Sequence, residues 1–228
     1  MRSLFILSLP RSFSSETFRL CRDALGLRAP IWTSEGEVLN NDRSVLYRGE
    51  RFEEGLKFTT AETAPREFAK ITAFLDQIVR PDGFIYKDVV QPFVASAWLA
   101  GRSDLAVLKI QPDLVHVASA IVARGWFYPT LASDGQGGRL RQLVQGLLRA
   151  QAAIQAVPGE AVRFTDLVGD ESPLREALQR LYPEMAVPEI PYLTPDFLAN
   201  RDAVRQRRAD PAYAMIGKLV DSLRGSAW

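Results

Sequence analysis

Short apolar runs alternate with helical segments along the chain, and this alternation constrains the fold more than any other feature of the sequence. The first run, residues 3–8, is apolar between its two serines and leads into a helical segment at residues 14–25. A continuous apolar run is typical of a strand that is buried on both faces. Strands that alternate with helices favour a parallel sheet covered by helices. We therefore predict an α/β fold in which helices flank both faces of a parallel sheet.

The same pattern predicts the later elements. Further strands are expected at 83–90, 104–110 and 161–167. Helices are expected at 65–79, 91–100, 111–125, 139–157 and 172–182, followed by a basic helical tail. Residues 28–62 are charged and poorly periodic, which indicates an irregular, peripheral segment outside the core. We expect a single domain over residues 1–228.

Composition and charge exclude several classes of protein. The net charge is +1, so no overall field attracts the chain to nucleic acid or to a membrane surface. One cysteine, Cys21, rules out an internal disulfide framework and fits a reducing compartment. The first apolar run is too short to span a membrane, and Arg11 ends it. We expect a cytoplasmic protein with no membrane span and no nucleic-acid partner, of open oligomeric state.

The junction between the first strand and the first helix has the composition of an anion site. Ser12, Ser14 and Ser15 supply hydroxyl groups, and Arg11 supplies a fixed charge with a forked set of donors. In a parallel sheet the helix that follows a strand points its free backbone N–H groups at the carboxyl edge, where they favour an anion. The alternative is a plain helix cap, since serine is a preferred capping residue.

The nucleoside-triphosphatase pattern GxxxxGK[ST] does not fit this junction. Aligned with residues 8–15, the chain has Ser8 and Phe13 where that pattern needs glycine, and Ser14 where it needs lysine. Only the final hydroxyl, Ser15, agrees. The loop therefore disfavours an enzyme that uses magnesium and ATP.

The segment LSLPRSFSSETFRL resembles the 5′-phosphosulfate loop of the sulfotransferase family, usually Pro-[Arg/Lys]-Ser-Gly-[Ser/Thr]-[Ser/Thr]. Phe13 stands where the family usually has glycine. Residues 162–183 are similar to a late strand-and-helix segment of the same family. LKIQPDLVHVASAIVARG is similar to the family's 3′-phosphate segment, with Pro112 and Ser119 present. Lys109 or Gln111 stands in place of its usual arginine.

This resemblance, to bacterial-type members, implies a P-loop-like fold. It also implies transfer of a sulfuryl group from 3′-phosphoadenosine-5′-phosphosulfate, without a metal, to a hydroxyl or amine. The acceptor would be a small molecule, a carbohydrate or a lipid, and residues 28–62 would lie on its side of the site. By the same resemblance the donor is bound by the following residues: Arg11, Ser12, Phe13, Ser14, Ser15, Lys109, Ser119, and Arg201 or Arg205 of the late basic segment.

Sulfuryl transfer needs a general base beside the acceptor and positive charge beside the moving group. The resemblance favours Glu37 as the base, with Glu35 second, although both also fit surface carboxylates. Lys87 ends a predicted strand, where ligands of open α/β sheets bind, or is a solvated strand-end lysine. His116 is a further candidate for the base, but a partly buried, hydrogen-bonded histidine is the favoured interpretation.

Two other functions stay open on the sequence alone. One is a P-loop kinase of small molecules, which the absent lysine and glycine of the loop oppose. The other is a non-catalytic domain that binds a nucleotide or a protein partner, which Phe13 and the absent 3′-site arginine keep in consideration.

Overall fold

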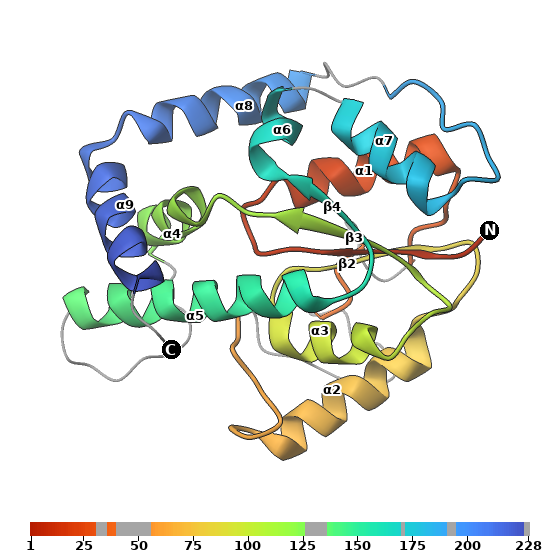
Figure 1. Ribbon diagram of the computed structural model, residues 1–228, viewed down its shortest axis with the longest axis horizontal. Helices are drawn as coiled ribbons and strands as arrows, with labels where there is room; N and C mark the ends of the chain where they lie inside the picture. Colours follow the sequence, from red (N-terminus) through yellow and green to blue (C-terminus); the bar gives the residue numbers. More distant parts are fainter. Residues whose placement is uncertain (31–35, 40–55, 126–135, 170–171, 191–194, 226–228) are drawn as a thin grey trace.

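Four short strands form one parallel sheet in the part of the chain that the computed structural model describes, residues 1–30, 36–39, 56–125, 136–169, 172–190 and 195–225 (Figure 1). They are β1 (Leu4–Leu7), β2 (Ile85–Asp88), β3 (Ala106–Gln111) and β4 (Glu160–Arg163). Their order in the sheet is β2-β1-β3-β4, and every neighbouring pair is parallel. The strands therefore end together at one carboxyl edge of the sheet.

Helices cover both faces of this sheet, as predicted (Figure 1). Their bounds are α1 (Ser14–Leu25), α2 (Pro65–Ile78), α3 (Pro92–Ala100), α4 (Leu114–Ala123), α5 (Gln136–Ala156), α6 (Phe164–Gly169), α7 (Ser172–Leu181), α8 (Pro195–Arg208) and α9 (Pro211–Arg224). One face carries α1, α6, α7 and α8, and the other carries α2, α3, α5 and α9. None of the helices in the described ranges is long and apolar enough to cross a membrane.

The central strand β1 contributes side chains to both hydrophobic cores, one on each face of the sheet. All four of its residues are fully buried. Leu4 and Ile6 pack with α1, α7 and α8, whereas Phe5 and Leu7 pack with α2, α3 and α5. Because successive side chains of a strand point to opposite faces, a strand between two helical layers has to be apolar throughout.

Two expectations about the elements are wrong in part. The strand expected at 161–167 ends at Arg163, and α6 begins at Phe164, since Asp166 fits the first turn of a helix. Residues 28–62 were expected outside the core, yet Val38, Leu39 and Leu56 are buried in it. Their neighbours are polar, so the local sequence lacks the period of a helix or strand that would reveal this burial.

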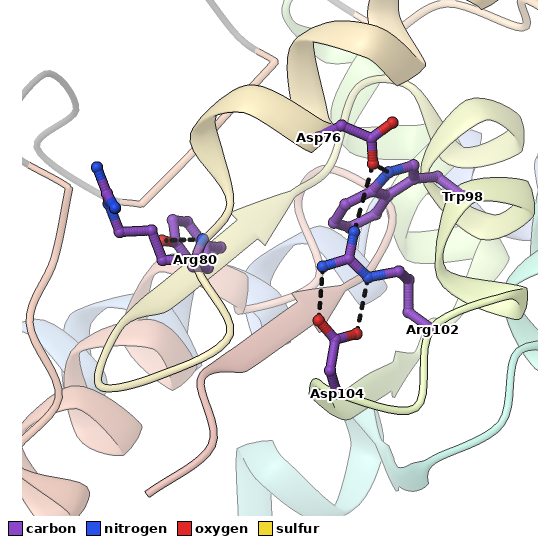
Figure 2. A network of polar contacts seen from close by, with 6 residues as sticks. Asp76, Arg80, Trp98, Arg102 and Asp104 are labelled. Atoms are coloured by element: carbon purple, nitrogen blue, oxygen red, sulfur yellow. Dashed lines mark hydrogen bonds and ion pairs between the residues drawn. The ribbon is translucent and has the colours of Figure 1, made fainter.

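Arg102 lies just before β3 and joins two helices to the amino end of the sheet (Figure 2). Its guanidinium binds Asp104 through two hydrogen bonds of 2.7 Å and approaches Asp76 of α2 at 3.3 Å. It also stacks over Trp98 of α3 at 4.5 Å, and the Trp98 indole donates to Asp76 at 2.8 Å. This network fixes the end of the sheet opposite the carboxyl edge and leaves that edge to the loops.

Candidate functional site

The loop after β1 contains two residues in a backbone conformation that glycine usually adopts. Phe13 caps α1 with φ 66° and ψ 16°, and Arg11 also has a positive φ of 64°. This left-handed region is uncommon for residues other than glycine. The Phe13 ring packs edge-on against Phe164 of α6 at 6.0 Å and Phe197 of α8 at 5.3 Å. These contacts offset the cost of the backbone conformation.

The serines of the loop have different environments. The Ser12 hydroxyl is buried and donates to the carbonyl of Leu9 at 2.6 Å, so it closes the turn. Ser14 is buried as the first residue of α1. Ser15 follows it, and its Oγ accepts a hydrogen bond of 3.0 Å from Lys87 Nζ. Ser15 is thus the loop hydroxyl that faces the end of β2.

Lys87, Ser15 and Glu37 come together at the carboxyl end of β2. Lys87 is fully buried, and its Nζ lies 3.1 Å from Glu37 Oε1. The backbone sets this contact, because Lys87 N donates to Gly36 O at 2.7 Å and Val38 N donates to Lys87 O at 3.0 Å. Glu37 thereby pairs with Lys87 as a short parallel bridge at the edge of the sheet. The other candidate base, Glu35, lies outside the described residues.

Gly36 holds the bridge in place through a backbone conformation that other residues avoid. Its φ is +72°, and a Cβ atom there would lie 2.0 Å from the ring of Phe18. We expect Gly36→Ala to lower the free energy of unfolding by at least about 1 kcal/mol, because the residue would be strained and would displace the ring. Chemical denaturation measures this loss.

Gly101→Ala is the matched control, since Gly101 has a negative φ of −91° and nothing within 4 Å of its added Cβ. We expect that variant to unfold as the wild type does. Equal stability of the two alanine variants would contradict the role given to Gly36.

Asp88 is a buried carboxyl beside this cluster that the sequence reasoning did not select as a site residue. It follows Lys87 on β2, and its carboxylate accepts hydrogen bonds from the backbone N–H groups of Gln91 at 3.0 Å and Val90 at 3.4 Å. Desolvation, with a smaller contribution from the charge of Glu37, raises the pKa of Asp88 to about 7 against the effect of those hydrogen bonds. Asp88 is therefore partly protonated near neutral pH.

The Asp88 carboxyl makes stability depend on pH. Its pKa is about 7 in the folded protein against 3.8 for the free group, so the folded state binds more protons between these values. Stability from this group is therefore present at low pH and is lost as pH rises from about 4 to about 7. We expect Asp88→Asn to abolish that loss, so that stability rises more with pH in the variant than in the wild type.

Urea unfolding at several pH values between 4 and 7.5 tests this expectation. His116 contributes in the opposite direction, because its pKa is lowered to about 4 and its neutral form is favoured in the folded state. Because both proteins contain His116, its contribution cancels in the difference between their free energies of unfolding. Parallel curves for the two proteins would show that Asp88 ionises as in the unfolded chain.

A cluster of arginines lies beside the other end of the loop. The pKa of Arg11 is lowered by desolvation and by the charges of Arg124 and Arg207. Arg207 belongs to α8, and its Nη1 approaches the carbonyl of Ser119 at 3.5 Å. Like charges that gather in this way are costly without an anion to neutralise them. The cluster therefore has the electrostatics of a binding site for a highly charged anion.

Arg207 is a further arginine of the basic tail, beside the predicted Arg201 or Arg205, and the roles of all three in donor binding stay predictions. Arg205 is 67% exposed and pairs with Asp202 at 3.7 Å, and Arg201 is half-buried on the same helix. The burial of Val204 shows which face of α8 meets the protein. Arg201 and Arg207 lie three residues before and after Val204, hence on that face, whereas Arg205 does not. The Nε atoms of Arg201 and Arg207 are both buried without a hydrogen-bond partner among the described residues.

Ser119 and His116 lie on one buried face of α4, three residues apart. Within the described part of the chain, Ser119 Oγ, His116 Nδ1 and Arg207 Nε are buried and have no hydrogen-bond partner. The His116 ring stacks on Phe164 at 4.9 Å. The expected burial of His116 is confirmed, but the expected hydrogen bond is not seen at its Nδ1.

Lys109 lies on the opposite face of the sheet from Lys87. β1 pairs Ile6 with Lys87 and Leu7 with Lys109, so the two lysines point to different sides. Lys109 Nζ donates to the carbonyls of Val157 at 2.5 Å and Gln155 at 3.3 Å, at the C-terminal end of α5. A cation is favourable there without any ligand. A role for Lys109 in donor binding stays a prediction.

The chain is similar in fold to two solved sulfotransferase structures. One is the sulfotransferase domain from the curacin biosynthetic pathway, with a TM-score of 0.48 and a sequence identity of 19%. The match covers 83% of this chain and 75% of that domain. The other is a sulfotransferase from Alicyclobacillus acidocaldarius, with a TM-score of 0.47 and a sequence identity of 15%. This match covers 99% of this chain and 96% of that protein. No protein-family model and no curated protein matches the chain. At this level of overlap, its chemistry has to be inferred from its own residues.

Proposed function

We propose that this protein transfers a sulfuryl group from 3′-phosphoadenosine-5′-phosphosulfate to a hydroxyl or amine of an acceptor. The observation that supports this proposal best is the contact of Lys87 with both Ser15 and Glu37, at 3.0 Å and 3.1 Å. A loop hydroxyl, a buried ammonium and a carboxylate thus meet where the strands of the sheet end. Group transfer from an anionic donor needs these three kinds of group in one place.

The donor would lie along the carboxyl edge of the sheet. In this proposal Arg11, Ser14, Ser15 and the backbone N–H groups at the start of α1 bind the 5′-phosphosulfate. Ser119 of α4 and Arg207 of α8 bind the 3′-phosphate. Desolvation and the charges of Arg124 and Arg207 lower the pKa of Arg11, and this repulsion between cations supports the binding of a highly charged anion.

The transfer step breaks the bond between sulfur and the bridging phosphate oxygen and forms a bond between sulfur and the acceptor oxygen. Lys87 would stabilise the negative charge on the sulfuryl and bridging oxygens, as fixed charges do in phosphoryl transfer. Glu37 would accept the proton that the acceptor hydroxyl loses. The leaving group is the 3′,5′-bisphosphate, which the loop continues to hold.

The acceptor would reach Glu37 from the outer edge of β2. The Glu37 side chain is 18% exposed, whereas its partner Lys87 is fully buried. A base that is accessible on one side and fixed by a buried cation on the other can receive an acceptor without losing its orientation. We propose a small-molecule, carbohydrate or lipid hydroxyl as the acceptor.

Calorimetric titration with 3′-phosphoadenosine-5′-phosphate, the expected product, tests this function. ATP with and without magnesium serves as the comparison. Binding of the bisphosphate without metal, with ATP much weaker, is the expected result. Tight binding of ATP that requires magnesium would indicate a kinase instead. Binding of neither nucleotide would indicate a domain that has lost, or never had, the donor site.

A further inference from the structure

His116 carries a polar atom, Nδ1, that is buried in the interior of the fold. The residue is 6% exposed and sits in the interior between α4 and α6. Within the described residues its Nδ1 has no hydrogen-bond partner. Buried polar groups nearly always have one, because an unmade hydrogen bond leaves the cost of desolvation uncompensated. This atom therefore needs a partner that the described part of the chain does not supply.

The only carboxylate that faces this histidine among the described groups, Asp113, is already engaged. Asp113 Oδ1 accepts the backbone N–H of His116 at 3.0 Å. Asp113 Oδ2 accepts the hydroxyl of Tyr213 at 2.9 Å and pairs with Arg208 at 3.3 Å. Its two oxygens are thus used to cap α4 and to attach α8 and α9. They do not serve the imidazole ring.

The other charged groups around His116 are cationic. Arg207 and Arg208 of α8 and Arg11 of the loop after β1 act on it through their positive charges. Desolvation, together with these charges, lowers the pKa of His116 to about 4. A histidine whose Nδ1 lacks a partner among the described residues, and which lies in the field of three arginines, has the electrostatic setting of an anion ligand.

Position on α4 indicates which anion the ring would meet. His116 and Ser119 are three residues apart and lie on the same face of the helix. Ser119 also has a buried hydroxyl without a partner among the described residues, and its carbonyl contacts Arg207. Three unused polar atoms, from His116, Ser119 and Arg207, therefore border the same part of the interior.

We propose that His116 is an anion-binding residue whose Nδ1 donates a hydrogen bond to the phosphate group bound by Ser119 and Arg207. This inference rests on the proposed function, in which that group is the 3′-phosphate of the donor. Stacking on Phe164 orients the imidazole, so the ring contributes a fixed donor. Because the bound anion neutralises the surrounding arginines, it also favours the protonated ring. Binding below neutral pH is therefore coupled to proton uptake by His116.

Two variants distinguish the contribution of the Nδ1 hydrogen bond from that of the aromatic ring. His116→Phe keeps an aromatic ring against Phe164 and removes the nitrogen. His116→Asn keeps an N–H donor at nearly the position of Nδ1 and cannot gain a charge. Calorimetry with adenosine 3′,5′-bisphosphate and adenosine 5′-monophosphate, from pH 5 to pH 8, compares both variants with the wild type. Thermal unfolding without ligand checks that each variant is folded.

We expect His116→Phe to lower the affinity for the bisphosphate by about 10- to 100-fold, the effect of losing one hydrogen bond to a charged group. The monophosphate should bind as it does to the wild type, and the unliganded variant should be at least as stable. His116→Asn should recover part of the affinity at pH 8. The advantage of the wild type over both variants should grow as pH falls.

Three results would overturn the inference. Unchanged bisphosphate affinity in His116→Phe would show that the ring nitrogen touches no phosphate. Equal losses for both nucleotides would show that His116 supports the fold of the site as a whole. If the wild type binds neither nucleotide, the proposed function fails and the inference fails with it, which distinguishes that case from the other two.

Discussion

Replacing Glu37 by glutamine is expected to lower kcat by about 10²–10⁴-fold, the usual contribution of a general base. Glutamine has the same size and still accepts a hydrogen bond from Lys87 through its amide oxygen. It cannot take a proton from the acceptor hydroxyl. Affinity for 3′-phosphoadenosine-5′-phosphate should therefore be unchanged, so turnover and product binding measured on one preparation separate catalysis from folding.

Glu160→Gln is the control for this variant. Glu160 also forms an ion pair, with Arg180 at 2.8 Å, but it lies at the start of β4, away from the carboxyl edge of the sheet. Removing the charge of Glu160 should leave turnover unchanged. Normal turnover in Glu37→Gln would show that Glu37 is not the base, and Glu35→Gln would then be the next variant to test.

Replacing Lys87 by methionine is expected to lower kcat by about 10²–10³-fold, the cost of removing one fixed group that stabilises charge in the transition state. Methionine fills a similar volume in the buried position without the ammonium. Product binding should also weaken, because the charge faces the phosphosulfate loop through Ser15. Single-turnover kinetics with saturating donor measure the chemical step apart from binding.

The loss of Lys87 also removes the partner of Glu37, and that effect has to be separated from catalysis. Breaking a buried ion pair on one side is strongly destabilising, whereas removing both charges costs less. The double variant Lys87→Met, Glu37→Gln should therefore be more stable than Lys87→Met alone, yet remain inactive. Recovery of turnover in the double variant would refute the role of Lys87 in stabilising the sulfuryl group.

The elements of the fold follow from local sequence, and so does part of the site. The apolar run of β1 predicts a strand between two helical layers, and the position of Lys87 at a strand end predicts that it lies at the ligand-binding edge. Ser15 follows from the composition of the loop. The positions of these residues in the fold are predictable because strand ends and helix starts are fixed by a few neighbouring residues.

Contacts between distant segments are less accessible to such reasoning. Glu37 meets Lys87 through a backbone bridge in a stretch that has no helical or strand period. Lys109 lies in β3, a strand that is apolar on both sides of it, so the sequence does not reveal which face its side chain takes. Whether Arg207 faces the site depends on which face of α8 is buried, and packing rather than charge determines that face.

Phe13 has a consequence for the kinetics of the proposed reaction. Its ring contacts Phe197, so the loop that would hold the leaving group is attached directly to the helix that supplies Arg207. A glycine at this position would leave the loop and α8 to move separately. With phenylalanine, loosening of α8 disturbs both ends of the bound bisphosphate at once. Product release is then one opening event, and its rate depends on how firmly two aromatic rings hold together.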